Sequence, residues 1–303
     1  EQLKQGEQQD KISAEDLKNI ISTVVSDWCT EIRRALDFFY STYPEDQITR
    51  IVLSGGGATK GIRVGADGRV DLGGSCRMPL AWRDPATGIW KIDSDEHNVV
   101  MIPVGWDALV ALTHPENPVK NITTEQLKAI FEGKLTSWKT LGGSDQPINL
   151  YYRKGYISGV GLTLRQILFQ DPQKEFTQNA TVLGSSGQIE RAVEGDPYGF
   201  AVSGISSARK RSVTILNIDG VKPTLDNLRR GDYTYYRILY LIAPPDYQED
   251  PHLNRFVQYV TSMKGQRLIR SFGTLPYIEG MHLNATRRMS RYAETLNAIE
   301  QAG

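Results

Sequence analysis

The chain has 303 residues, of which 40% are hydrophobic and 23% are charged, and its 35 basic residues balance 35 acidic ones. This length suits two lobes better than one ordinary core, and the composition is that of a globular protein. A net charge of zero argues against a nucleic-acid surface or a polybasic membrane patch, so we expect no nucleic-acid partner. No apolar run in the sequence is long enough to span a bilayer.

The N-terminal region begins with the polar stretch EQLKQGEQQD, which is not a signal peptide. We interpret it as the start of either a cytoplasmic protein or a mature chain whose leader has been removed. From Ser13 onward, apolar residues recur at steps of three and four and predict one long amphipathic helix, or two joined ones, up to Tyr43-Pro44. Residues 48–53 are predicted to form a strand, and the glycines of residues 54–57 a tight turn.

The central stretch contains two apolar runs, residues 99–104 and 108–113, which predict two buried strands. The sequence HPENPV then breaks the chain, because each proline restricts itself and the residue before it. Thr123 or Thr124 is expected to cap a helix. The apolar face of this helix consists of Leu127, Ile130 and Phe131.

A third predicted strand, residues 148–152, delivers Arg153 into a loop that contains glycine and serine and opens a further helix. The free backbone N–H groups and the dipole at such a helix start both favour negative charge. An arginine adds a permanent cation with forked donors. This stretch therefore predicts an anion-binding site, the plainer alternative being a surface arginine paired with a nearby acid.

The remaining chain alternates between strands and helices. Predicted strands are residues 69–74, 198–202, 213–218 and 236–243. Predicted helices are residues 188–193, 253–268 and a tail at 285–301, while residues 82–95 are predicted to be a surface excursion. The four histidines show no metal-ligand spacing, so no metal or cofactor is expected. Cys29 and Cys76 are both expected to be free thiols.

Residues 114–148 read HPENPVKNITTEQLKAIFEGKLTSWKTLGGSDQPI and resemble a signature of the PstS-like phosphate-binding proteins of bacterial ABC importers. The resemblance extends from about residue 60 to about residue 280. It implies an α/β, two-lobed type II periplasmic-binding-protein fold, with mixed sheets flanked by helices, that closes over a small oxyanion such as phosphate. It also implies a non-enzymatic protein of the periplasm or cell exterior that works with ABC transporter membrane subunits.

The same resemblance implies a set of ligand-binding residues. They are Arg153, Ser158, Gly159, Gly57, Thr59, Ser75, Cys76 and Arg77. Relative to the family pattern, the loop after Arg153 is one residue longer, Val160 replaces a threonine, and Cys76 replaces a serine or aspartate. Arg77 is implied either to brace the hinge or to touch the ligand. The scaffold therefore resembles the family more closely than the pocket does, and phosphate is either bound weakly, replaced by another ligand or no longer bound.

The segment ISTVVSDWCTEIRRALDFFYSTYPEDQITRIVLSGGGA resembles instead the C-terminal subdomain of PilM, the actin-like type IV pilus assembly protein. Three explanations stay open: a natural fusion, an engineered chimera and a misassigned N-terminal sequence. A native PilM-like start would make the protein cytoplasmic. The expected organisation is a PilM-like helix and strand integrated in lobe 1 at 1–58, lobe 1 at 59–113, lobe 2 at 114–200, a return to lobe 1 at 201–280 and a helical tail at 281–303.

Two other interpretations stand beside the binding protein. In the first, the chain is a structural or interaction protein with a degenerate pocket, which self-assembles through its N-terminal helix or C-terminal tail. In the second, it is a nucleotide-dependent pilus component, and the missing phosphate loops and metal-binding acids argue against this. No catalytic set is predicted, because there is no nucleophile elbow, and Asp71 and Asp107 suit a turn cap or hinge anchor better than an acid–base pair.

Overall fold

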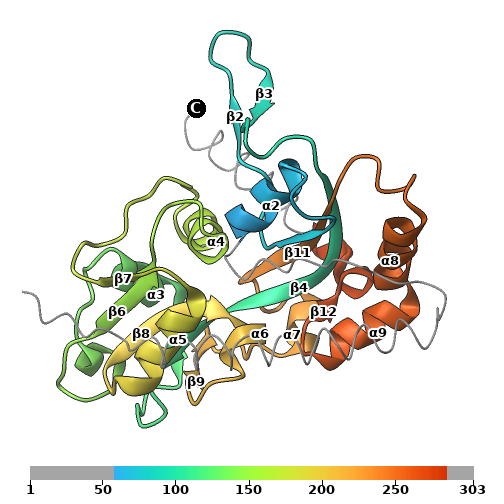
Figure 1. Ribbon diagram of the computed structural model, residues 1–303. Helices are drawn as coiled ribbons and strands as arrows, with labels where there is room; N and C mark the ends of the chain where they lie inside the picture. The colour runs from blue at the N-terminus through green and yellow to red at the C-terminus, as the bar shows by residue number, and fades with distance from the viewer. Residues whose placement is uncertain (1–57, 285–303) are drawn as a thin grey trace, which may run out of the picture. The chain divides into compact units, whose positions relative to one another are not determined.

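The computed structural model describes residues 58–284, which lie within a compact unit of the chain that begins at Arg50. The predicted N-terminal helix, the predicted strand at 48–53 and the predicted tail at 285–301 lie outside the described residues. The described part is an α/β structure in which helices flank a mixed sheet, as the sequence predicted (Figure 1). None of its helices is both long and apolar enough to cross a membrane.

The secondary structure follows the chain in this order. The strands are β1 (Gly73–Ser75), β2 (Ala81–Arg83), β3 (Trp90–Ile92), β4 (Val100–Thr113), β5 (Asn121–Ile122), β6 (Asn149–Arg153), β7 (Thr181–Leu183), β8 (Gly199–Gly204), β9 (Thr214–Ile215), β10 (Asn217–Ile218), β11 (Tyr236–Ala243) and β12 (Leu275–Pro276). The helices are α2 (Ala58–Ala66), α3 (Thr124–Phe131), α4 (Gly159–Leu168), α5 (Ser186–Gly195), α6 (Ile205–Ala208), α7 (Leu225–Arg230), α8 (Pro251–Thr261) and α9 (Met263–Ser271), with 3-10 helices η1 (Trp138–Leu141) and η2 (Tyr277–Gly280).

The main sheet is organised around the long strand β4, which changes partners along its length. Residues 100–108 pair antiparallel with β11, and residues 109–113 pair antiparallel with β8. The order across the sheet is β1-β11-β4-β8-β6-β7, with β6 parallel to both β8 and β7. We call the two sides the β11 half, which includes β1, β12 and α2, and the β8 half, which includes β6, β7, α4 and α5 (Figure 1).

β4 is a single strand, whereas the sequence predicted two. Residues 105–107, which separate the two predicted strands, belong to the strand, and the structure also accommodates Pro103 within it. The register between β4 and β11 shifts beside Val104, and such a bulge tolerates Pro103, which has no N–H to donate. Gly105 allows β12 to approach closely, since a Cβ there would lie only 2.9 Å from Cγ2 of Thr274.

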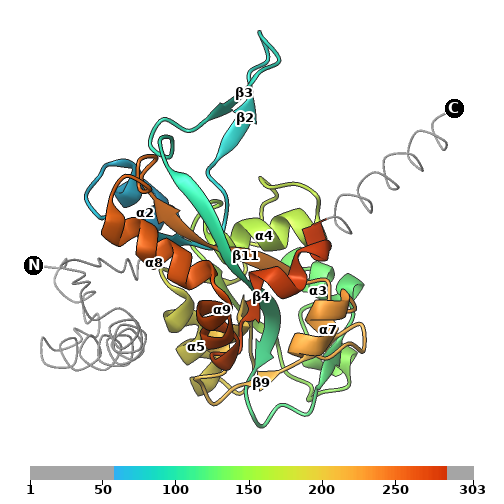
Figure 2. The same cartoon turned by 90° about the vertical axis from the view of Figure 1, so that its right-hand side faces the viewer.

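Local sequence signals explain where several elements begin and divide. Thr123 is the N-cap of α3, and its hydroxyl and the Gln126 side chain form the capping box that satisfies two free N–H groups. The predicted helix 253–268 is divided into α8 and α9 at Ser262, whose hydroxyl accepts a hydrogen bond from the Gly265 N–H. The predicted strand 213–218 consists of β9, which pairs with β4, and β10, which pairs with β5. The predicted excursion at 82–95 contains the β2–β3 hairpin, which projects from the β11 half (Figure 2).

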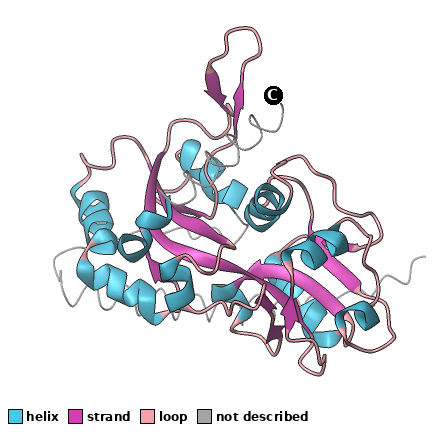
Figure 3. Cartoon of the chain, turned by 180° about the vertical axis from the view of Figure 1, so that it is seen from behind, coloured by secondary structure: helices cyan, strands magenta, loops and turns pink. Residues whose placement is uncertain are grey.

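The buried apolar residues form two hydrophobic clusters. The larger cluster surrounds the second part of β4 and includes Leu109, Phe131, Trp138 and Phe200. The smaller cluster lies in the β11 half and consists of Leu72, Ile102, Ala243 and Val257. Helices cover both clusters, with α4 and α5 against the strands of the β8 half and α9 and α2 against those of the β11 half (Figure 3). The larger cluster also includes Trp106, Tyr236 and Leu275, so it extends from the β8 half into the β11 half.

Candidate anion-binding site

The start of α4 has the features expected of an anion site. β6 ends at Arg153, and after the loop 154–157 Ser158 is the N-cap of α4, its hydroxyl accepting a hydrogen bond of 3.1 Å from the Gly161 N–H. The N–H groups of Gly159 and Val160 have no partner within the helix, because they belong to its first turn. The positive end of the helix dipole adds to these donors, so this helix start favours an anion.

Arg153 is a half-buried cation without a counter-charge in the described part of the chain. Within residues 58–284 its side chain makes no hydrogen bond or ion pair, and its Nε atom is buried without a partner. Burial lowers the pKa of Arg153 below its usual value; Cys76 opposes this change, and the positive charge of Arg237 adds to it. Two guanidinium groups therefore lie near each other, and the interaction of Arg153 with a bound anion would relieve both its burial and their repulsion.

Cys76 lies against the first residue of α4. Its Sγ atom accepts a hydrogen bond of 3.0 Å from Nη1 of Arg237, and the thiol is free, as the sequence predicted. Cys29 lies outside the described residues. A Cβ atom on Gly159 would lie 2.1 Å from Cys76 Sγ, which is closer than any real contact. Glycine at position 159 is therefore what allows the segment after β1 to reach the start of α4.

Arg237, on β11, is held in place by Asp107 of β4. Its Nε and Nη2 atoms donate to the same carboxylate oxygen, at 3.1 and 2.8 Å, and the other oxygen of Asp107 accepts from the Ser206 N–H at 3.2 Å. Burial alone would lower the pKa of Arg237, but Cys76 and Asp107 together raise it above its usual value. Asp107 therefore anchors a charge beside the site.

Arg77 is a buried brace whose guanidinium is already occupied by protein groups. It makes two hydrogen bonds to the Glu96 carboxylate, at 2.6 and 2.7 Å, and both side chains are almost fully buried. Its Nε donates to the Ile157 carbonyl at 3.0 Å, and its Nη2 also donates to the Thr59 hydroxyl at 3.0 Å. Of the two roles that the sequence left open for Arg77, this geometry favours the brace.

The hydroxyls of Thr59 and Ser75 take part in the same network. Thr59 Oγ1 donates to the Ile157 carbonyl at 3.2 Å, in addition to accepting from Arg77. Ser75 Oγ donates to the Arg77 carbonyl at 2.8 Å and accepts from the Arg77 N–H at 3.2 Å. Both hydroxyls therefore stabilise the segments that meet at the site, and Gly57 lies outside the described residues.

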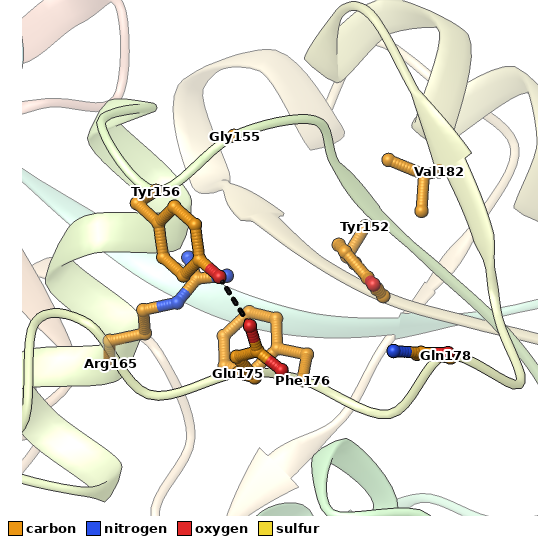
Figure 4. A pocket seen from close by; sticks show the side chains of 8 residues that line it. All are labelled: Tyr152, Gly155, Tyr156, Arg165, Glu175, Phe176, Gln178 and Val182. Carbon is orange, nitrogen blue, oxygen red and sulfur yellow. Dashed lines mark hydrogen bonds between the residues drawn. The ribbon is translucent and has the colours of Figure 1, made fainter.

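The loop that follows β6 is supported by Arg165 of α4 (Figure 4). The Arg165 guanidinium lies 3.8 Å from the centroid of the Phe176 ring and 5.0 Å from that of the Tyr156 ring. Its Nε donates to the Lys174 carbonyl at 2.7 Å, and the Tyr156 hydroxyl donates to Glu175 at 2.9 Å. These contacts fix Tyr156, and with it the loop between the strand and the helix start.

The predicted site residues thus divide into two groups. Those that the structure brings together at the helix start are Arg153, Ser158, Gly159 and Cys76. Those that build the supporting network are Thr59, Ser75 and Arg77. Val160 packs in the larger hydrophobic cluster, so its side chain belongs to the core.

Arg237 and Glu96 were not among the site residues predicted from the sequence. A signal for Arg237 was present, because an arginine inside the apolar run YYRILYLIA needs a buried partner. Nothing in the sequence around Glu96 distinguishes it from the acidic residues of a surface loop.

Comparisons with known proteins agree with this fold. The sequence model of the PBP superfamily domain matches residues 18–264. The chain is 29% identical over 177 residues to the phosphate-binding protein PstS of Borreliella burgdorferi, covering 56% of this chain and 63% of that protein. It is 29% identical over 185 residues to PstS of Bacillus subtilis, covering 60% of this chain and 57% of that protein. The chain therefore spans about three fifths of the length of these relatives.

Solved structures are similar to the whole described architecture. A phosphate ABC transporter substrate-binding protein from Clostridium perfringens, with bound phosphate, has a TM-score of 0.68 at 23% identity and covers 82% of this chain and 94% of its own. An ABC-type phosphate transport receptor from Vibrio cholerae has a TM-score of 0.58 at 22% identity, covering 82% of this chain and 96% of its own. At these identities the likeness shows the fold, and it confirms the predicted periplasmic-binding-protein architecture.

Proposed function

The chain belongs to the PBP superfamily, and from that premise we propose that it is a solute-binding protein for a phosphate-type oxyanion. The observation that carries the proposal is the unpaired, half-buried Arg153, which lies with Arg237 and Cys76 beside the start of α4. A buried cation needs a partner to compensate for the water that it loses. A bound oxyanion provides that partner and also accepts the hydrogen bonds of the helix start.

The charges at the site favour an anion over a neutral solute. Arg153 and Arg237 contribute two positive charges, and Asp107 neutralises one of them. Ser158 and the first N–H groups of α4 add neutral donors. Because hydrogen bonds to charged groups contribute more than neutral ones, the surplus positive charge should dominate the affinity.

The anion would be held between two lobes. Cys76 and Arg237 come from the β11 half, whereas Arg153, Ser158 and Gly159 come from the β8 half. We assign residues 59–113 and 201–280 to one lobe and residues 114–200 to the other, with closure of the two over the solute. The hydrogen bonds from Arg77 and Thr59 to the Ile157 carbonyl already join the segments from which the two sets of ligands come.

The partners and location follow from the relatives. We propose inorganic phosphate or a similar oxyanion as solute, ABC transporter membrane subunits as partners, and the periplasm or cell exterior as location. These proposals rest on PstS proteins, about three fifths of whose length this chain spans. The resemblance of residues 1–58 to PilM stays a prediction outside the described residues, and the family model starts inside that segment, at residue 18.

The test of this function is the loss of the Arg153 charge. We expect Arg153→Ala to weaken anion binding roughly ten- to a hundredfold, because a hydrogen bond to a charged group contributes about 1.5–3 kcal/mol. Arg153→Lys should recover part of the affinity, since it restores the charge without the forked donors. Titration calorimetry with phosphate, sulfate and arsenate measures both effects.

Lys154→Ala is the matched control, because it removes a positive charge from the next residue, which is exposed. We expect it to change affinity less than threefold, since exposed charges are screened by solvent and salt. Equal affinity of Arg153→Ala and the unmutated protein for each anion would show that the site lies elsewhere. Failure of the unmutated protein to bind any of the three would refute the proposed oxyanion class.

A further inference from the structure

A cavity of about 310 Å³ lies next to Cys76 and Arg237. With Arg153, Ser158 and Gly159, these two residues form the group at the start of α4 that we call the anion cluster. Small-molecule sites span roughly 300–1,000 Å³, so this cavity is far larger than a five-atom oxyanion needs. Cys76 and Arg237 are among the residues that line it. Leu162, Ile238 and Tyr240 contribute apolar surface, and Arg77, Thr163 and Gln166 contribute polar groups. The space therefore shares Cys76 and Arg237 with the anion cluster and continues between apolar and polar side chains.

The geometry of α4 connects the two ends of this cavity. Gly159, which contacts Cys76, lies three, four and seven positions before Leu162, Thr163 and Gln166, all of which line the cavity. Residues at these spacings share one face of a helix. The face of α4 that starts with the anion-binding N–H groups is thus the same face that forms a wall of the cavity.

A further part of the cavity wall is fixed by the buried brace. It consists of residues 77–81, which lead into the β2–β3 hairpin. Glu96 accepts a hydrogen bond of 2.9 Å from the Leu80 N–H, and Arg77 donates to the Met78 carbonyl at 2.8 Å. This wall is therefore held by the Arg77–Glu96 pair, which keeps the cavity open beside the anion cluster.

The cluster itself offers donors and no spare carboxylate. Hydrogen phosphate carries one P–OH group that needs an acceptor, whereas the dianion of a phosphate ester or phosphonate has only acceptor oxygens. Within the described residues, the three buried carboxylates of this region are all occupied: Asp107 by Arg237 and Ser206, Glu96 by Arg77 and Leu80, and Glu190 by Ser203 and Ser207. Cys76 Sγ already accepts from Arg237, which leaves its S–H as a donor.

We propose that this site takes a monosubstituted phosphate dianion, a phosphomonoester or an organophosphonate, with its short substituent in the cavity along α4. The proposal rests on the proposed function and deepens it. The phosphoryl group would accept from Arg153, Ser158 and the start of α4, and the substituent would contact Leu162, Ile238 and Tyr240. Sulfate has only acceptor oxygens, so it could accept the hydrogen bonds of the anion cluster. It has no substituent, so it would leave the cavity unfilled.

Calorimetry with the full chain at about pH 8, where a phosphomonoester is a dianion, tests the proposal. The probes are inorganic phosphate, sulfate, phenyl phosphate and phenylphosphonate. We expect at least one of the two phenyl compounds to bind roughly tenfold or more tightly than inorganic phosphate, because its ring buries apolar surface in the cavity. Inorganic phosphate binding as tightly as, or more tightly than, both phenyl compounds would overturn the proposal and leave the proposed function standing.

Leu162→Trp, which fills the cavity, should reduce the ratio of phenyl phosphate affinity to phosphate affinity to about one. Val182→Trp is the matched control. It adds a similar ring at an exposed position in a separate pocket, which Tyr156 and Arg165 also line, and it should leave the ratio unchanged (Figure 4). Ala81→Trp, at the exposed edge of the cavity wall, is a second filling variant if Leu162→Trp does not fold. An unchanged ratio in a folded filling variant would overturn the proposal, and absence of binding by every probe would overturn the proposed function as well.

Discussion

Replacing Glu96 by glutamine would break the ion pair that braces the site while keeping the shape of the side chain. The Glu96 side chain is fully buried and the Arg77 side chain is 2% exposed, and they are joined by two hydrogen bonds of 2.6 and 2.7 Å. Glutamine would leave the Arg77 charge buried without a counter-charge. Breaking such a pair on one side costs about 3–5 kcal/mol, so we expect Glu96→Gln to lose that amount of unfolding free energy.

The expected loss of unfolding free energy in Glu96→Gln is larger than the loss caused by breaking an exposed ion pair. For a unit of this size, the expected loss lowers Tm by roughly 6–20 °C. Asp145→Asn is the matched control, because Asp145 pairs with Lys139 while both side chains are largely exposed, and we expect a change of at most about 1 kcal/mol. Urea unfolding and thermal scans of the two variants give the comparison.

The same variant should also change the pH dependence of stability. Burial on its own raises the pKa of Glu96, but Arg77 and the Leu80 N–H lower it below its usual value of 4.5. A lowered carboxyl pKa contributes stability that is present above the unfolded value and is lost as pH falls through the folded one. The difference between Glu96→Gln and the unmutated protein should therefore shrink as pH falls below 4.5. A loss under 1 kcal/mol at neutral pH, or a difference that does not depend on pH, would refute this reasoning.

Two further predictions concern Gly159 and Glu190. Gly159→Ala should lose about 1–3 kcal/mol in urea unfolding, because its Cβ would overlap Cys76 Sγ, and Cys76→Ala in the same chain should restore part of the loss; equal stability of Gly159→Ala and the unmutated protein would contradict this. Burial raises the pKa of Glu190 even though Ser203 and Ser207 donate hydrogen bonds to it, so its ionisation reduces stability as pH rises above the usual value of 4.5. Glu190→Gln should therefore gain stability relative to the unmutated protein as pH rises above 4.5 in urea unfolding, and a difference that does not change with pH would contradict this.

The parts of the fold that were predictable are those whose physical cause is local in the sequence. The cap at Thr123 and the strand that ends at Arg153 both depend on residues within one or two turns of chain. The start of α4 was predictable for the same reason, because Ser158 caps the helix by accepting a hydrogen bond from the N–H of Gly161, three residues later. The helix start that follows Arg153 could therefore be placed in the sequence before its geometry was known.

The parts that were not predictable depend on partners distant in the sequence. Arg237 and Asp107 are 130 residues apart, and nothing in either segment indicates that they meet. The continuity of β4 through Pro103 and Gly105 was missed because the bulge that permits it depends on β11. Arg77 was predictable as a residue of interest, but its role as a brace depends on Glu96, which lies in a polar stretch.

The partner exchange along β4 has a consequence for the order of folding. The second part of β4 contacts a segment that is closer in the sequence, since Thr113 and Gly199 are 86 residues apart. In the first part of β4, Asp107 contacts Arg237, which is 130 residues away. During synthesis the strands of the β8 half are complete before β11 has been made, so the first part of β4 has an unpaired edge in the interval. Pairing of distant strands is also slow, because the long loop must close first. The contact between Cys76 and Arg237 therefore forms late, and the candidate anion site of a nascent chain is incomplete until β11 has joined the sheet.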